Sequence, residues 1–292
     1  MLTRRLIYNV AVSLLLCCAA AAQEKEPERE PQTAAEFAGR GSDRMKRREL
    51  DAAVADFDRA VQLSPGDAQT YNLRGVVRGM KGDAAGAVAD FGMAITLDPS
   101  NASAYYNRGL TYARKGEEER ALADFNTAIS LNPKDAAAYN GRAVIRSKRG
   151  DNTGAIADYD RLLAINPGSA EAYSNRAISK HKLGDYEGAL ADYGKSIELR
   201  PDYAYAYNNR GNTYGKLGFD DKAIADFDKA ISLVPNFAAA YANRGLAELS
   251  KGLDAAAERD FRKALEISGG LREMIETESN KIREQRKARQ RP

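Results

Sequence analysis

The chain has 292 residues, of which 43% are hydrophobic and 29% are charged. These fractions are ordinary for a folded globular protein and exclude a collagen-like, a mostly disordered or a polytopic membrane chain. The 44 basic and 41 acidic side chains leave a net charge of +3. This charge is too small to indicate nucleic acid as a partner. At about 150 residues per domain, length alone would suggest two domains.

The rare residue types limit the chemistry that the chain can perform. It has two adjacent cysteines, one histidine and no tryptophan. A zinc site made of Cys and His needs about four ligands, so we expect no metal and no cofactor. An enzyme of the Ser-His-Asp type would have to use His181, which has no hydroxyl or thiol nucleophile at a readable spacing. We therefore interpret His181 as a solvated side chain and expect no enzymatic activity.

Residues 1–22 have the pattern of a secretory signal peptide. Two arginines precede an apolar stretch that runs to Cys18, and Ala20 and Ala22 occupy the two small-residue sites of a cleavage motif. The mature chain would begin at Gln23. The sequence thus predicts export, to the periplasm or the exterior if the source is bacterial.

Two other fates of this segment stay open. The apolar stretch is shorter than the roughly 20 residues that span a bilayer, but it could remain as an uncleaved anchor. Lipidation at Cys17 or Cys18 is disfavoured because no small residue precedes either cysteine. Cleavage would remove both cysteines and leave no disulfide. Residues 23–33, rich in Glu, Pro and Gln, are expected to form a disordered linker.

One fixed period governs the chain that follows. An aromatic position recurs without a slip, at Phe37, Tyr71, Tyr105, Tyr139, Tyr173, Tyr207 and Tyr241. A proline keeps the same period, at Pro65, Pro99, Pro133, Pro167, Pro201 and Pro235. A fixed period of this size indicates stacked supersecondary units. Seven units fit, numbered 1 to 7 below: 34–67, 68–101, 102–135, 136–169, 170–203, 204–237 and 238–271.

Each unit has the pattern of a helix, a turn and a second helix. In unit 3 a first apolar face ends at Gly116, because glycine supplies the backbone freedom that a helix stop requires. A second apolar stripe ends before Pro133, which cannot continue a helix. The small residues Gly109 and Ala121 should let the two helices approach closely, with Phe125 filling the space beside them.

These positions resemble the tetratricopeptide repeat family, whose repeat pattern combines an aromatic residue, glycine, alanine, a second aromatic and proline. The resemblance implies an all-α fold, a right-handed α-solenoid of seven helix-turn-helix repeats with a concave groove. Two terminal departures fit the expectation that outer repeats are atypical: Arg48 replaces the turn glycine of unit 1, and Gly269 replaces the proline of unit 7. Residues 272–292 are predicted to form a capping helix that ends in a basic tail.

Every unit also pairs an arginine of its first helix with an aspartate of its second helix at a fixed spacing, from Arg40 and Asp56 to Arg244 and Asp260. A partly buried arginine needs a carboxylate partner, and repetition in all units indicates an architectural role. The sequence leaves open whether each aspartate bonds within its unit or to the arginine of the next unit.

Asparagines recur beside this arginine, and a Lys/Arg column follows at Arg114, Lys148, Lys182 and Lys216. The resemblance implies that such asparagines can hold the backbone of a bound peptide, because an amide both donates and accepts; the alternative is a role in the general repeat pattern. The cations could simply favour the helix dipole or attract an acidic partner. Tyr203 and Tyr205 exceed what the repeat needs. The candidate peptide-binding residues are Asn107, Asn140, Asn175, Lys182, Tyr205, Asn208, Asn209, Asn212, Lys216 and Asn243.

The function predicted from these features is an exported, non-enzymatic scaffold that binds an extended peptide or a partner protein in the concave groove. We expect a monomer and no nucleic-acid partner. The alternative is an envelope- or membrane-surface-associated protein that acts through its basic end, residues 281–292, or through an uncleaved N-terminal anchor. The thin apolar face of this basic end argues against membrane binding.

Overall fold

The computed structural model describes residues 30–289, so the predicted signal segment and most of the predicted linker lie outside the described residues. Residues 30–289 form fifteen α-helices and one short 3₁₀ helix, and no strand occurs in this range. The prediction of an all-α solenoid with a capping helix is confirmed. None of these helices combines the length and the apolar character that a bilayer crossing requires.

Fourteen of the helices form seven antiparallel pairs, one pair in each repeat unit. The first helices are α2 (Ala34–Lys46), α4 (Ala68–Met80), α6 (Ala102–Arg114), α8 (Ala136–Lys148), α10 (Ala170–Lys182), α12 (Ala204–Lys216) and α14 (Ala238–Ser250). The second helices are α3 (Leu50–Leu63), α5 (Ala84–Leu97), α7 (Glu118–Leu131), α9 (Asn152–Ile165), α11 (Tyr186–Leu199), α13 (Asp220–Leu233) and α15 (Asp254–Ile267). The 3₁₀ helix Gly269–Leu271 and α16 (Arg272–Arg289) follow.

The turn inside each unit depends on one left-handed residue. Gly116 has a φ of +79°, and the equivalent glycines of the other units lie between +77° and +87°. Glycine takes this conformation without a Cβ clash. Arg48 of unit 1 adopts a φ of +64° at the same position, which costs a side-chain-bearing residue about 1–2 kcal/mol.

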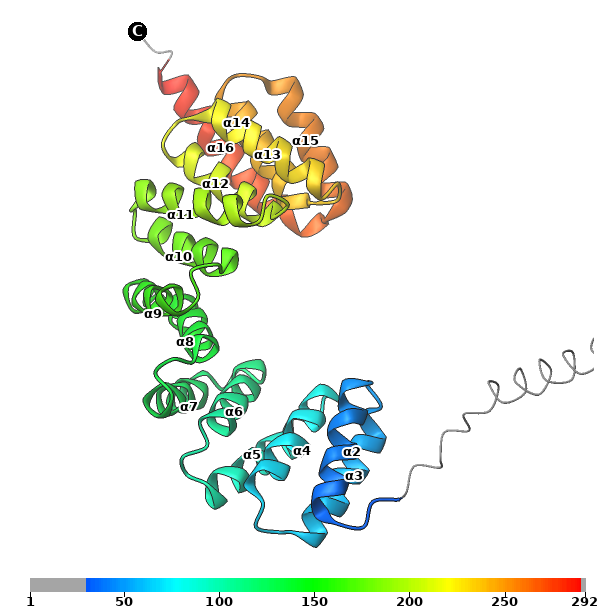
Figure 1. The fold of residues 1–292 in the computed structure, drawn as a ribbon. Helices are drawn as coiled ribbons and strands as arrows, with labels where there is room; N and C mark the ends of the chain where they lie inside the picture. The colour runs from blue at the N-terminus through cyan, green and yellow to red at the C-terminus, as the bar shows by residue number, and fades with distance from the viewer. Residues whose placement is uncertain (1–29, 290–292) are drawn as a thin grey trace, which may run out of the picture.

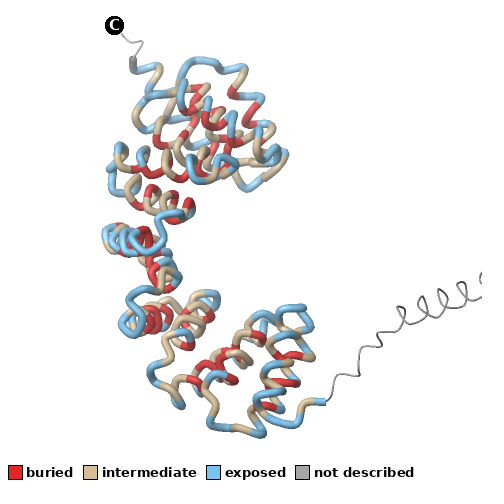
Figure 2. Tube along the Cα trace, viewed as in Figure 1, coloured by how far each residue is buried: buried red, intermediate tan, exposed pale blue. Residues whose placement is uncertain are grey.

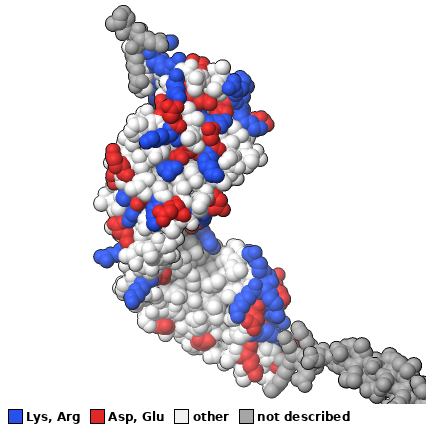
Figure 3. Space-filling model, turned by 45° about the horizontal axis from the view of Figure 1, so that its top comes forward, with Lys and Arg blue, Asp and Glu red and all other residues white. Residues whose placement is uncertain are grey.

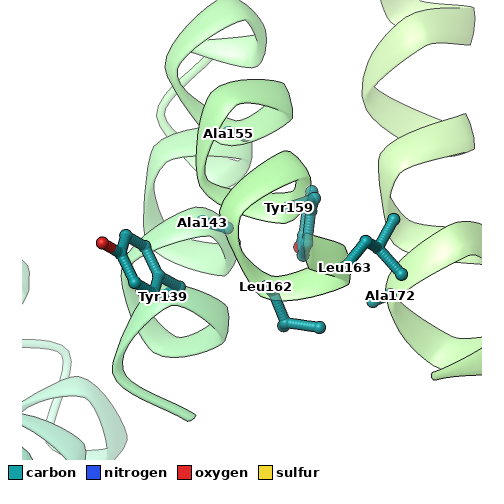
Figure 4. Packing of buried hydrophobic residues seen from close by; sticks show 7 residues of the cluster. All are labelled: Tyr139, Ala143, Ala155, Tyr159, Leu162, Leu163 and Ala172. Carbon is teal, nitrogen blue, oxygen red and sulfur yellow. The ribbon is translucent and has the colours of Figure 1, made fainter. Parts of the chain in front are cut away.

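Small residues bring the paired helices close together, as predicted for unit 3. A Cβ added to Gly109 would lie 3.1 Å from Cε1 of Phe125, and Ala121 and Phe125 are fully buried. The neighbouring cluster in Figure 4 shows the same design, with Tyr159 of α9 beside Ala143 of α8, and Leu163 pointing toward Ala172 of α10. Each core is therefore shared between one unit and the next.

The units stack into a curved rod (Figure 1). Each second helix packs against its own first helix and against the first helix of the next unit. Buried residues follow these contacts, while the turns are largely exposed (Figure 2). A single unit is too small to bury its apolar faces by itself, so stacking provides the burial.

Helix α16 closes the C-terminal end by packing on α14. Its Ile275 is 5% exposed and joins the cluster formed by Leu249 and Phe261. Two arginines of this helix are held by acids of unit 7. Arg283 bonds to Glu258 at 2.8 Å, and Arg286 bonds to both carboxylate oxygens of Asp254 at 2.7 and 3.1 Å.

The repeated arginine bonds to the aspartate of its own unit in all seven units. In unit 4, Arg142 donates from Nε and Nη2 to the two carboxylate oxygens of Asp158 at 2.9 and 2.6 Å. Asp158 is only 2% exposed. The bond thus clamps the first helix to the second, and the alternative pairing with the arginine of the next unit does not occur within residues 30–289.

Four of these arginines also reach the preceding unit through a different acceptor. Nη1 of Arg142 donates to Asn126 at 2.7 Å. This acceptor lies on the second helix of the preceding unit, just beyond that unit's own clamp aspartate, Asp124. Three other arginines use an aspartate there: Arg74 with Asp58, Arg176 with Asp160, and Arg244 with Asp228. One guanidinium therefore joins two units.

A second cation supports the clamp in four units, one helical turn after the first arginine. Arg146 donates to Asp158 at 2.9 Å, and Arg44, Arg78 and Lys180 do the same in units 1, 2 and 5. Unit 7 has Glu248 at this position. Its Oε2 is buried and has no hydrogen-bond partner among the described residues. Burial and the nearby Asp260 carboxylate raise the pKa of Glu248 above its ordinary value.

Replacing Asp158 tests the clamp. Asp158→Ala should lower the free energy of unfolding by about 3 kcal/mol, because it leaves Arg142 and Arg146 partly buried without their carboxylate. Urea unfolding followed by circular dichroism measures the change. The control is Glu198→Ala, which breaks the exposed pair of Lys195 and Glu198 and should cost about 0.5 kcal/mol or less. Equal costs for the two variants would contradict a structural role of the clamp.

Restoring the cation in unit 7 should stabilise the protein. Glu248→Arg places a guanidinium where four units carry a cation and should raise the free energy of unfolding by about 1 kcal/mol at neutral pH. Because the folded state raises the pKa of Glu248, it binds the proton more tightly than the unfolded state, and stability falls as pH rises above about 4.5. The gain should therefore shrink in acid. Glu248→Gln, which removes only the charge, should give a smaller gain, and a loss of stability in Glu248→Arg would refute this account.

Candidate functional site

The inner surface of the curve is made of the first helices. Successive first helices contact one another along the whole stack, from α2 with α4 to α12 with α14. Elements on the inside of a curve come closer together than those on the outside. Figure 1 shows α6, α8 and α10 on the concave side and α7, α9 and α11 on the outer side. The predicted binding residues all lie on the helices of this concave side.

Several of the candidate asparagines are used in packing between units. Nδ2 of Asn107 donates to Oδ1 of Asn72 at 3.1 Å, and Nδ2 of Asn243 donates to Oδ1 of Asn208 at 3.0 Å. Asn208 is 6% exposed and donates in turn to Asn209 at 3.2 Å. These amides bridge neighbouring first helices, which is a role in the repeat itself.

The other candidates present more of their polar groups to the solvent. Asn140, Lys182, Tyr205 and Lys216 are exposed, and Asn175 and Asn212 are partly buried. Among the described residues, no side chain bonds to the amide group of Asn140, Asn175 or Asn212. The candidate set thus divides into packing amides and available groups, which run from α8 to α12.

His181 is not a solvated side chain as the sequence suggested; it is partly buried and joins two units. Its Nδ1 lies 2.9 Å from Oγ1 of Thr213, whose hydroxyl donates to the carbonyl oxygen of Asn209 at 3.0 Å. We infer that Nδ1 carries the proton and donates to Thr213, which leaves Nε2 as an acceptor. Burial, and then the Lys216 ammonium, lower the pKa of His181, so the ring is neutral at pH 7.

Tyr205 stands at the centre of an aromatic group on the inner surface. It is 59% exposed, and its ring centroid lies 4.9 Å from that of Phe237 and 6.2 Å from that of Tyr203. The Arg200 guanidinium covers the ring of Tyr203, and its Cζ lies 3.6 Å from the centroid of that ring. The Tyr205 ring is therefore supported by Phe237 and Tyr203, and its exposed part offers both an apolar face and a polar hydroxyl group.

Two contributors were missed by the sequence reasoning. Val144 is 47% exposed and lies one helical turn from Asn140 and from Lys148 on α8, so these three residues form one inner stripe. Phe237 supports Tyr205 from the start of the next first helix. Val144 is an apolar residue in an otherwise polar stripe of α8. Phe237 occupies a helix N-cap position, where a polar residue is usual. Both departures can be recognised in the sequence.

Charge is distributed unevenly over the surface. Lys and Arg side chains gather with acidic ones over the C-terminal units at the top of Figure 3, while a broad, largely uncharged surface lies below them. Lys148 is paired with Glu118 at 2.6 Å, whereas Lys182 makes only long contacts with Ser147, at 3.4 Å. In residues 30–289 no cluster of three or more His, Cys, Asp or Glu side chains could hold a metal ion.

Solved structures with the same architecture are numerous. YrrB, described as a tetratricopeptide repeat protein with an unusual peptide-binding site, is 25% identical over 63% of this chain and 95% of its own, with a TM-score of 0.57. MamA is 27% identical over 59% of this chain and 94% of its own, with a TM-score of 0.52. A tetratricopeptide repeat protein from Parabacteroides merdae shares the fold over 86% of this chain and 99% of its own, at 24% identity and a TM-score of 0.63. No curated protein matches the chain.

Family models match more than half of the chain. The model described as TPR repeat matches residues 80–116, 145–184 and 179–218. Two models described as tetratricopeptide repeat match residues 102–135, 204–237 and 238–270. Together with the seven helix pairs and their shared cores, these matches show that the chain belongs to the tetratricopeptide repeat family.

Proposed function

We propose that the protein is an exported, non-enzymatic scaffold that holds an extended peptide, or an extended segment of a partner protein, on the concave surface of units 4 to 6. The observation that carries this proposal is the row of available groups on successive first helices. Asn140 and Val144 lie on α8, Lys182 on α10, and Tyr205 on α12.

The chemistry of this row suits a peptide better than a small molecule. An amide can bond to a peptide group in either direction, Val144 and Tyr205 offer apolar contact, and the lysines would favour acidic side chains on the ligand. Tyrosine is enriched among the residues that dominate protein interfaces. The row is open and crosses three units, as an extended ligand requires.

The similarity to YrrB supports the same assignment. That protein has an unusual peptide-binding site, and its sequence is 25% identical to this chain over the matched region. The proposal for this chain nevertheless depends on its own exposed residues, which also define the experiment.

Peptides selected against the wild-type protein from a random display library should lose about tenfold in affinity for Tyr205→Ala and for Asn140→Ala, which corresponds to about 1.4 kcal/mol each. Calorimetric titration measures the affinities. Because His181 lies on α10 between these two residues, the imidazole resonances of this single histidine should shift when a peptide binds to the wild type.

The matched control is Phe219→Ala, which removes an aromatic side chain that is 49% exposed at the N-cap of the second helix α13. It should bind the selected peptides as the wild type does. Unchanged binding to both Tyr205→Ala and Asn140→Ala, with no shift at His181, would place the ligand elsewhere.

The exported part of the proposal depends on residues 1–22 and has its own test. The intact mass of protein recovered from the exported fraction should correspond to a chain that begins at Gln23. A bulky residue at a small-residue site, as in Ala22→Phe, should block this cleavage. Exported protein that retains its N-terminus would favour the uncleaved anchor instead.

A further inference from the structure

Two lysines at the ends of neighbouring first helices lack the acid that a third lysine has. In unit 4, Lys148 bonds at 2.6 Å to Glu118, which lies at the start of the preceding second helix. In the next two units the equivalents of Glu118 are uncharged: Asn152 and Tyr186. Lys182 of α10 and Lys216 of α12 therefore have no acid opposite them. Both lysines are exposed, and neither forms an ion pair within residues 30–289.

These lysines belong to the surface where successive first helices meet. Lys182 reaches back to α8, where its Nζ lies 3.4 Å from both the carbonyl oxygen and Oγ of Ser147. His181, the residue before it, reaches forward to Thr213 of α12 at 2.9 Å. Lys216 occupies on α12 the position that Lys182 occupies on α10. Because first helices meet on the inner side of the curve, these side chains lie beside the path of an extended ligand. His181, Lys182 and Lys216 are called the cationic site below.

The first helices around the cationic site carry little negative charge. In α8, α10 and α12 the single acid is Glu171, which bonds to Arg200 at 3.1 Å. The other lysines and the arginines of these three helices are all held by acids of second helices. Lys182 and Lys216 thus remain as uncompensated positive charges on the inner surface.

Two acids follow in the turn after α10, and neither compensates these lysines. Asp185 caps α11, where it accepts from the backbone of that helix. Glu187 corresponds to Glu119 of unit 3, which bonds to Arg149 of the next unit. Leu217 stands at the position of this arginine opposite Glu187. Neither Asp185 nor Glu187 forms an ion pair with the cationic site in the described part of the chain.

His181 adds a group whose charge depends on pH. Tyr186 of α11 packs edge-on against the imidazole, with 5.1 Å between the ring centroids, while Thr213 and Lys216 approach from α12. Since Nδ1 donates to Thr213, Nε2 is the atom that gains a proton as the pH falls. Burial, and then the Lys216 ammonium, lower the pKa of His181. No acid bonds to the imidazole among the described residues, so the free protein disfavours its charged form.

We propose that the segment held in the groove contributes a carboxylate to the cationic site, and that its binding strengthens as the pH falls. This inference rests on the proposed function and names the chemistry of the ligand. Lys182 and Lys216 would provide the charge that a carboxylate needs when it leaves water. Protonated His181 would donate to the carboxylate from Nε2. By linkage, the bound carboxylate favours the proton on the imidazole, and the proton favours the carboxylate to the same extent.

The test uses peptides selected against the wild-type protein from a random display library at about pH 5.5, where free Asp and Glu side chains remain largely ionised. Each peptide is made in three forms: as selected, with Gln and Asn in place of Glu and Asp, and with an amidated C-terminus. Loss of affinity in one of the last two forms tells a side-chain carboxylate from a chain end. The form that keeps the carboxylate should bind about tenfold more tightly than the form that lacks it.

The pH dependence has two readouts. Calorimetric titration should give an affinity for the carboxylate form that is about fivefold higher at about pH 5.5 than at about pH 7.5. The imidazole resonances of His181, the single histidine of the chain, should titrate at a higher pH when this form is bound than in the free protein.

Three variants connect these effects to the cationic site. Lys216→Met should lose most of the preference for the carboxylate form. His181→Gln, whose amide can still donate to Thr213, should lose the pH dependence. The matched control, Lys229→Met, removes an exposed lysine of the second helix α13 and should keep both effects. Thermal unfolding should confirm that all variants are folded.

The proposal is overturned if the wild type binds all three peptide forms equally, if Lys216→Met keeps the full preference, or if His181→Gln keeps the pH dependence of the wild type. Equal binding of the three forms with a shift of the His181 resonances would reject the carboxylate and leave the groove as a peptide site. No shift at His181 with any peptide, and unchanged binding to Tyr205→Ala and Asn140→Ala, would reject the proposed function and this inference with it.

Discussion

One guanidinium group in each unit determines how the helices are held. The alanine-rich faces of these helices are small and would allow several packing angles, because dispersion contacts have little directional preference. A bidentate bond between arginine and carboxylate is directional. Arg142 bonds in this way to Asp158 while its third nitrogen reaches Asn126 of the preceding unit. The clamp therefore fixes both the helix pair and its position on its neighbour.

The charges around this clamp are balanced in most units. Unit 2 has two cations, Arg74 and Arg78, facing Asp90 and Asp58. Arg108 of unit 3 and Arg210 of unit 6 have no second acid, because Gly92 and Gly194 occupy its position in the preceding units. These two units also lack the second cation, which is replaced by Tyr112 or Tyr214. These rings lie 5.9 Å from the clamp guanidinium. Loss of one charge is thus accompanied by loss of its counterpart, as expected where an unpaired charge is costly.

Much of the fold follows from the sequence because its determinants are local. Three determinants act within one unit: the turn glycine, the proline, and the small residues that leave room for the second aromatic side chain. The same determinants recur in each unit along the chain. The contacts that were missed lie between units. Asp58 with Arg74, Asn72 with Asn107, and His181 with Thr213 are separated by 16 to 35 residues. Their pairing depends on the rotation of one unit against the next, which the period does not specify. The candidate asparagines were divided into packing and available groups for the same reason.

Departures from the repeat's own rules concentrate in the last three units, and most of them oppose stability. Glu248 adds a carboxylate beside Asp260 and Asp228, with Arg244 as the clamp cation. Phe219 and Leu253 give up polar caps, and Tyr205 exposes an aromatic ring. A protein tolerates such choices where a surface is used and the rest of the stack provides the stability. Units 1 to 4 keep the charged turns, and units 5 to 7 carry Leu183, Phe219 and Leu253 in their turns and the exposed ring of Tyr205 on α12. The cost of these departures is offset by the rest of the stack, because each unit is stabilised by packing on its neighbours.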